Sequence, residues 1–228
     1  GGQRVAGSLA GGPEPDGHAP QRPAPRALDD RRADEPVGQA RRLGHRIVGK
    51  AIDDRVALAV MTELLRTVDR SHLTFDLTLA ATVQEEIGLI GALSLGRDGQ
   101  FDLAIALDNG PIGDYPGVDP REMPIRLGCG PALVYKDWWV HYDRRVIRML
   151  RDVAAKASIP VQETTFQGFG SDGAALVRNG VPTALLAVPT RYTHSAFELA
   201  DERDIAGMLD LLRAFVTAPT EPLPLGPS

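Results

Sequence analysis

The sequence predicts an α/β fold, in which helices pack against a sheet, because segments with two different hydrophobic periods alternate along the chain. Residues 53–70 place apolar side chains at helical spacing, so we expect them to form an amphipathic helix. Residues 75–84 alternate apolar and polar side chains, which indicates a strand with one buried face. Residues 102–110 are almost entirely apolar, as is typical of a strand covered on both faces.

The first predicted helix, residues 53–70, carries Val56, Val60 and Leu64 along one line. The two aspartates at its start are favourable there, because the N-terminal end of a helix carries partial positive charge. The later elements expected from the same patterns are helices at 141–157, after 170–173 and at 202–217, and strands at 160–166 and 182–189. Asp201 is suited to the N-cap position of the last helix.

The composition excludes several classes of protein. A net charge of −5 over 228 residues gives no indication of a nucleic-acid or membrane-surface partner. A single cysteine, Cys129, excludes an internal disulfide framework and favours a reducing, cytoplasmic setting. No apolar run approaches the ~18 residues that a membrane span needs. The first residues also lack the continuous apolar core of a signal peptide.

Three regions are expected along the chain. Residues 1–45 are rich in Pro, Gly, Arg and Asp and show no hydrophobic period, so they predict a low-complexity, disordered segment. Residues 46–217 have the pattern of a folded domain, and residues 218–228 form a Pro-rich tail.

Polar side chains follow several of the predicted elements, where functional groups of α/β sheets usually gather. Asp53 opens the first helix, and Glu85 and Glu86 end the strand at 75–84. Asp108 ends the following strand, and His194 comes after the last one. Carboxylate and imidazole groups are ligands for zinc, cobalt or manganese, so this set predicts a metal site.

Each of these residues also has a purely structural explanation. The aspartates at 53–54 would serve as a helix cap, and Asp108 precedes an Asn-Gly turn. Glu85 and Glu86 would be solvated loop acids, and a lone histidine after a strand is often structural. Residues 170–173 suit a helix cap, and Cys129 is expected to be a packed, unreactive thiol.

The adjacent pair Glu85-Glu86 restricts the possible chemistry. Neighbours on a regular strand point to opposite faces, so both acids reach one site only if the backbone turns there, and Gly88 follows almost at once. A glycosidase needs its two carboxyl groups about 5 Å or more apart across a sugar. Adjacent acids suit a divided role instead, in which one binds a metal and the other moves the proton of a water.

Several ordered segments resemble the dinuclear metallo-aminopeptidase family of glutamyl, deblocking and tetrahedral aminopeptidases, some of whose members are described as cellulase M-like. The matching stretches are 49-GKAIDDRVALAV-60, 82-TVQEEIGLIGA-92, 107-LDNG-110 with 114-DYPG-117, 128-GCGPAL-133 and 180-GVPTALLAVPTRYTHS-195. The resemblance covers roughly residues 46–215. It implies a three-layer α/β/α zinc-peptidase-like catalytic domain with a mixed sheet, incomplete at its N-terminus and without the family's β-barrel insert domain.

Carried over residue by residue, the resemblance implies two divalent metal ions, which would be zinc, cobalt or manganese. Asp53 would bridge the two ions, and its peptide bond to Asp54 resembles one that is cis in this clan. Glu86 and His194 would bind one ion, and Asp108 would bind the other.

The resemblance further implies a metal-dependent aminopeptidase that hydrolyses N-terminal residues from peptides. Glu85 would take the proton of a water held between the ions, the hydroxide would attack the peptide carbonyl, and Glu85 would return the proton to the leaving amine. Arg191 and Tyr192, close to His194 in the sequence, would either shape the substrate pocket or simply pack.

The family's early His-x-Asp motif has no counterpart before Asp53. His18 and His45 lack an aspartate two positions later, and His141 has one at Asp143 but comes after most of the other ligands. This absence, with a start that lacks methionine, predicts an N-terminally truncated copy that holds one ion tightly and the second weakly or not at all.

Three functions therefore stay open at the level of the sequence. The first is a metal-dependent aminopeptidase, and the second is a catalytically impaired remnant that binds a metal or a partner. The third is a related amidohydrolase that removes acyl groups from amino acids. The family is typically homo-oligomeric, but its dodecameric assembly relies partly on the β-barrel domain, so the oligomeric state is also open.

Overall fold

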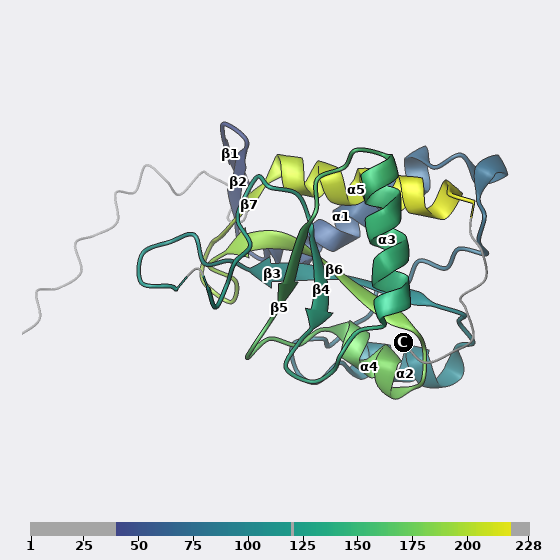
Figure 1. Cartoon of the computed structure of the whole chain (residues 1–228). Helices are drawn as coiled ribbons and strands as arrows, with labels where there is room; N and C mark the ends of the chain where they lie inside the picture. The colour runs from purple at the N-terminus through teal and green to yellow at the C-terminus, as the bar shows by residue number, and fades with distance from the viewer. Residues whose placement is uncertain (1–39, 120, 220–228) are drawn as a thin grey trace, which may run out of the picture. The chain divides into compact units, whose positions relative to one another are not determined.

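The computed structural model describes residues 40–119 and 121–219, so most of the predicted segment 1–45 and of the Pro-rich tail lies outside the described residues. Helices and strands alternate along the described part (Figure 1). The helices are α1 (Ile52–Thr67), η2 (Arg70–His72), α2 (Ile90–Asp98), α3 (Arg144–Lys156), α4 (Asp172–Arg178) and α5 (Glu202–Thr217). The strands are β1 (Arg41–Leu43), β2 (Arg46–Gly49), β3 (Ala104–Pro111), β4 (Ala132–Lys136), β5 (Gln162–Thr165), β6 (Thr183–Arg191) and β7 (Glu198–Asp201).

The strands form one mixed sheet in the order β1-β2-β7-β6-β4-β5, and β3 also pairs with β6 outside this order. β3 and β6 run parallel, from Ala104 opposite Thr183 to Pro111 opposite Thr190. β4 is antiparallel to β6, which makes the sheet mixed. Because β3 and β6 are parallel, their carboxyl ends lie at the same edge of the sheet, and the residues that end them come close together.

Helices cover both faces of the sheet, as the predicted three-layer α/β/α architecture requires. Figure 1 shows α1 and α5 above the strands and α2 and α4 below them. α5 contacts α1, α3 and β6, whereas α4 contacts α2, β3 and β6. β6 is consequently buried on both faces from Thr183 to Thr190, which explains its nearly continuous apolar sequence.

The predicted strand at 75–84 is absent, and this prediction is wrong. The segment has no hydrogen-bonded neighbouring strand among the described residues and runs as an irregular chain. The alternation still describes its burial in part, because Phe75, Leu77 and Leu79 pack against the core and Phe75 stacks on Phe215 at 5.3 Å. Val83 is 67% exposed. The alternation of apolar and polar residues indicates which side chains face the core, but it does not show whether a neighbouring strand is available for pairing.

Cys129 is exposed, which corrects the expectation of a packed thiol. Gly128 and Gly130 on either side of it have left-handed φ values of 78° and 94°. The backbone N–H groups of both glycines donate to the buried carboxylate of Asp204, at 2.7 Å each. The turn therefore directs its backbone toward the protein and the Cys129 side chain toward solvent.

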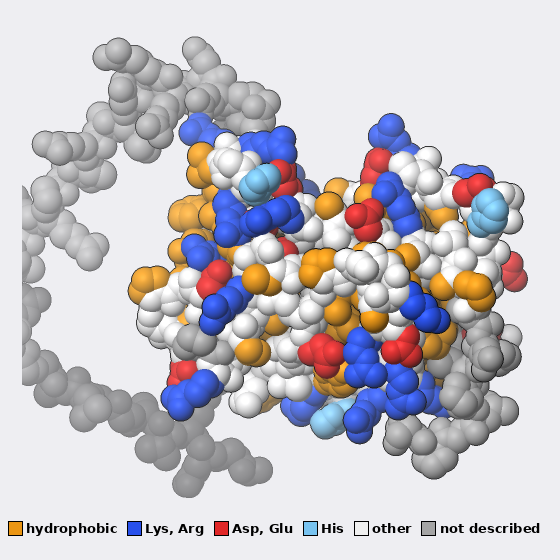
Figure 2. All heavy atoms as spheres, turned by 45° about the horizontal axis from the view of Figure 1, so that its top comes forward, with side chains coloured by type: hydrophobic (Ala, Val, Ile, Leu, Met, Phe, Trp, Pro, Cys, Tyr) orange, Lys and Arg blue, Asp and Glu red, His pale blue; other side chains and the backbone are white. Residues whose placement is uncertain are grey.

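β1 begins at Arg41, so regular structure starts a few residues before the predicted boundary at residue 46. None of the described helices combines the length and the apolar character needed to cross a membrane. The face shown in Figure 2 carries interspersed basic and acidic side chains.

Candidate metal centre

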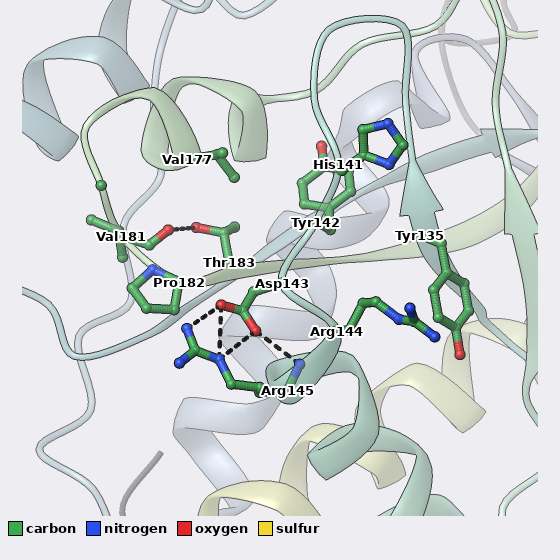
Figure 3. A pocket seen from close by; sticks show the side chains of 11 residues that line it. Tyr135, His141, Tyr142, Asp143, Arg144, Arg145, Val177, Val181, Pro182 and Thr183 are labelled. Atoms are coloured by element: carbon green, nitrogen blue, oxygen red, sulfur yellow. Dashed lines mark hydrogen bonds and ion pairs between the residues drawn. The ribbon is translucent and has the colours of Figure 1, made fainter. Parts of the chain in front are cut away.

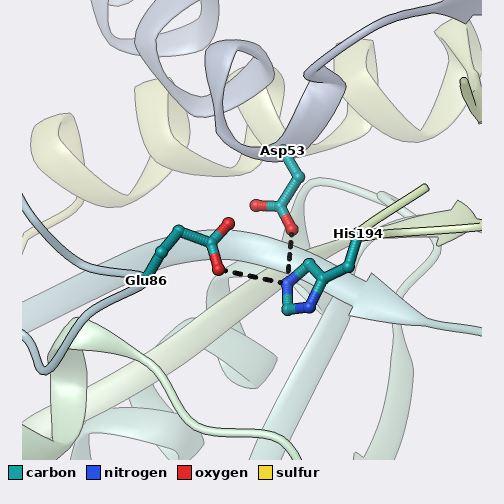
Figure 4. Close-up of side chains that lie close together, drawn as sticks. All are labelled: Asp53, Glu86 and His194. Carbon is teal, nitrogen blue, oxygen red and sulfur yellow. Dashed lines mark ion pairs between the residues drawn. The ribbon is translucent and has the colours of Figure 1, made fainter. Parts of the chain in front are cut away.

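Asp53, Glu86 and His194 converge at the edge of the sheet where β3 and β6 end (Figure 4). The Nε2 atom of His194 lies 3.4 Å from Oδ2 of Asp53 and 3.3 Å from Oε2 of Glu86. One potential ligand atom from each residue lies within 4.8 Å of the other two. Residues that are far apart in the sequence thus form one cluster, as predicted for one of the two metal positions.

Two of the three spacings in this cluster match those around a tetrahedral divalent ion. Ligand atoms about 2.0–2.1 Å from a tetrahedral zinc ion lie about 3.3–3.4 Å from one another. The two separations at His194 agree with this value. The side chains of His194 and Glu86 are 64% and 58% exposed, whereas that of Asp53 is only 10% exposed. The cluster is therefore open to an ion or substrate from solvent and closed on the side of Asp53.

Of the two aspartates at the start of α1, Asp54 caps the helix and Asp53 faces the cluster. Their peptide bond is cis, in agreement with the resemblance, and both have non-helical backbone angles. The Oδ1 atom of Asp54 accepts the N–H of Ala57 at 3.0 Å, which caps the regular part of the helix. Asp53 is left free to face His194 and Glu86.

The chain turns directly after Glu85, as the adjacency of the two glutamates predicted. The N–H of Gly88 donates to the carbonyl of Glu85 at 3.0 Å, and Gly88 has a φ of 126° that favours glycine. Burial, followed by the charges of Asp172, Glu86 and Asp53, raises the pKa of Glu85 to about 7. Both glutamates therefore face the same acidic region.

Asp108 is buried within β3, which continues to Pro111, so Asp108 does not end the strand as predicted. It is not one of the three residues of the cluster. Burial, and then the charges of Asp54 and Asp53, raise its pKa well above the ordinary value. Its Oδ1 atom accepts the N–H of Asn109 at 2.7 Å. Its predicted role as a ligand of a second ion stays a prediction.

Glu198 is a member of this region that the sequence patterns did not reveal. It begins β7, it is only 3% exposed, and its carboxylate accepts the backbone N–H groups of both Asp53 and His194. The only signal in the sequence is an acid four positions after His194. Asp172, which accepts a hydrogen bond from Thr82 and influences Glu85, was also missed as part of the site.

The cap predicted at residues 170–173 is only partly confirmed. Ser171 occupies the N-cap position of α4, but its side chain makes no cap hydrogen bond.

His141 and His45 lie away from the cluster of Asp53, Glu86 and His194. His141 lines a separate hollow of about 510 Å³ next to the start of α3, together with Tyr135 and Thr183 (Figure 3). His45 pairs with Glu202 at 2.7 Å. Neither belongs to the three-residue cluster.

Arg191 and Tyr192 have structural partners close to the cluster. The Arg191 guanidinium donates to Asp114 at 2.7 Å. The Tyr192 ring packs against Tyr115 and Phe197, with ring centroids 5.5 and 5.9 Å apart. Packing accounts for both side chains, and a role in the substrate pocket stays a prediction.

Comparison with known proteins shows which family the chain resembles. A family model described as M42 glutamyl aminopeptidase matches residues 36–211. The lysyl aminopeptidase of Pyrococcus furiosus is 33% identical over 175 residues, which cover 75% of this chain and 49% of the relative. The glutamyl aminopeptidase of Lactococcus lactis is 32% identical over 176 residues, covering 77% and 48% respectively. The chain thus spans about half the length of these curated relatives.

Solved structures show the same fold. An aminopeptidase from the archaeon Desulfurococcus kamchatkensis superposes with a TM-score of 0.76 at 35% identity, over 80% of this chain and 52% of that one. A TET aminopeptidase from a marine sediment archaeon of the Thaumarchaeota gives a TM-score of 0.73 at 30% identity, over 79% and 51%. Sequence, fold and family model agree: the chain belongs to the M42 glutamyl aminopeptidase family.

Proposed function

We propose that this chain carries the metal-binding and catalytic residues of an aminopeptidase that removes N-terminal residues from peptides. The observation that supports this most is the convergence of Asp53, Glu86 and His194, directly beside Glu85, in a chain of the M42 family. A divalent ion held by these three groups would act as a Lewis acid that polarises the peptide carbonyl and lowers the pKa of an attacking water.

The chain's own residues would perform the remaining steps. Glu85 is half-buried and precedes Glu86 directly, which supports its proposed role as the group that would accept a proton from the attacking water. The same carboxyl group would then give the proton to the leaving amine. Asp53 and Asp108 are the two described residues proposed for a second ion, and two ligands hold an ion less firmly than three. We therefore propose one tightly bound ion per chain, which would be zinc, cobalt or manganese.

A Glu85→Gln variant tests the mechanism. Loss of the proton acceptor should lower the hydrolysis of aminoacyl p-nitroanilides by about 10²–10⁴-fold. Elemental analysis should still find one tightly bound ion per chain, because Glu85 is not one of the three ligands. Glu163→Gln, on β5 at the far edge of the sheet, is the matched control and should leave the rate unchanged. A near-normal rate for Glu85→Gln would contradict the role of Glu85, and two tight ions would contradict the proposed stoichiometry.

The same assay distinguishes the alternative functions. Hydrolysis of N-acyl amino acids but not of aminoacyl anilides, with added zinc, cobalt or manganese, would identify an amidohydrolase. Metal binding without turnover of either substrate would identify a catalytically impaired remnant.

The assembly and the cellular setting stay predictions. The TET1 peptidase of Pyrococcus horikoshii, 26% identical to this chain, is described as assembling into a tetrahedron or a large octahedral shell. A homo-oligomer is accordingly the proposed assembly of the family, and light scattering after gel filtration measures whether this chain forms one. The cytoplasmic setting rests on the single cysteine alone.

A further inference from the structure

Glu198 joins the two parts of the chain that supply Asp53 and His194. Its Oε2 atom accepts the backbone N–H of Asp53 at 2.8 Å, and its Oε1 atom accepts that of His194 at 3.2 Å. The side chain is nearly fully buried, at 3% exposure. Its own backbone is held in the sheet, because Glu198 pairs with Gly49 in the antiparallel register of β2 and β7. One rigidly placed carboxylate thus contacts two of the three residues of the cluster.

The two N–H groups lie at backbone positions outside regular helix and strand geometry. Asp53 has a φ of −77° and a ψ of 112°, within a break at the start of α1. His194 has a left-handed φ of 61°, in the loop between β6 and β7. Both hydrogen bonds are partly buried, and a backbone N–H that is shielded from water and lacks an acceptor is costly. Glu198 provides the acceptor for both at once.

We infer that Glu198 is a positioning residue that sets the separation between Asp53 and His194 before an ion binds. This inference rests on the proposed metal-binding function. When a group that orients a metal ligand from outside the coordination sphere is altered, metal affinity typically falls by about 10–100-fold. Holding the ligands in place beforehand removes the ordering that binding would otherwise require.

The geometry restricts which side chain can do this. A glutamine at this position has one acceptor oxygen, and its NH₂ group would face the second N–H donor. An aspartate keeps both acceptors, but its side chain is shorter by about 1.5 Å, one carbon–carbon bond, so its carboxylate does not reach the same two N–H groups. Glu198→Gln changes the charge and one acceptor, whereas Glu198→Asp changes only the reach.

Metal titration of Glu198→Gln is the test. Affinity is measured for cobalt by its absorption spectrum and for zinc by competition with a chelator. The variant should bind about 10–100-fold more weakly than the unchanged chain. Asp204→Asn is the matched control, because Asp204 is also a buried carboxylate that accepts two backbone N–H groups, from Gly128 and Gly130. It should leave the affinity unchanged, since neither glycine belongs to the cluster.

Glu198→Asp separates positioning from charge. Loss of affinity in this variant supports positioning, whereas full retention shows that Glu198 acts through its negative charge and overturns the inference. Unchanged affinity of a folded Glu198→Gln also overturns it. If the unchanged chain binds no ion, the proposed function fails and this inference fails with it.

A measurement on the unchanged chain covers the case in which the variants do not fold. Amide hydrogen exchange in the presence of chelator should be slow at the N–H groups of Asp53 and His194, because Glu198 holds both without an ion. Rapid exchange at either position would overturn the inference.

Discussion

Asp204 provides a quantitative test of how burial controls ionisation in this fold. It lies fully buried near the start of α5, and its two oxygens accept the N–H groups of Gly128 and Gly130 at 2.7 Å each. Burial is the largest influence and raises its pKa from 3.8 to about 6, although the two N–H groups act in the opposite direction. The desolvation of the carboxylate therefore outweighs its hydrogen bonds.

The sign of the effect on stability follows from the direction of this shift. Because the pKa is higher in the folded state than in the unfolded state, ionisation of Asp204 disfavours folding. Its contribution to stability is fully present below about pH 3.8 and is lost as the pH rises through about 6. Between about pH 5 and about pH 7.5, linkage with these two pKa values gives a loss of about 1.4 kcal/mol.

Urea denaturation followed by circular dichroism measures this loss. The unchanged chain and Asp204→Asn are compared at about pH 5 and about pH 7.5, with chelator present so that metal binding does not contribute. Asparagine does not titrate, so the free energy of unfolding of the unchanged chain should fall by about 1.4 kcal/mol more than that of the variant. The contributions of the other titratable groups cancel in this comparison. Parallel pH dependence of the two proteins would refute the reasoning.

Two further substitutions test the cluster and the core. His194→Ala removes one of the three proposed ligand groups and should weaken cobalt or zinc binding by at least about tenfold in the metal titration described for Glu198. Its stability without metal should change little, because the His194 side chain is 64% exposed. Unchanged metal affinity would contradict the role of His194 as a ligand. Leu150→Ala, at a fully buried position of α3, should lower the free energy of unfolding by about 2–5 kcal/mol. Leu65→Ala, on the exposed side of α1, is the control and should have a much smaller effect. Equal losses of stability in the two variants would contradict the assigned core.

The elements that were predicted well are those whose signal is local. The helices α1, α3 and α5 and the strands β3, β5 and β6 lie where hydrophobic periodicity placed them, since a helix or a buried strand imposes its period on a short stretch of sequence. Asp201 caps α5 as expected, accepting the N–H of Arg203 at 2.9 Å. The segment 75–84 shows the limit of this reasoning, because a strand also needs a neighbour and periodicity does not supply one.

The three residues that the structure brings into one cluster could also be proposed as metal ligands from the sequence alone. Asp53, Glu86 and His194 stand in short ordered motifs at the ends of elements, and the turn after Glu85 follows from the glycine behind it. Their identities could be recognised without coordinates because each motif is contiguous in the chain.

Only the tertiary structure decided how these groups meet. Asp53 follows β2 and His194 follows β6, and both strands pair with β7, so two segments distant in sequence meet with their side chains 3.4 Å apart. Glu198 carries no local signature, because its role consists of contacts with two backbone segments that are distant in sequence. Spatial contacts between distant residues depend on the whole packed chain, whereas periodicity and motifs depend on a few neighbours.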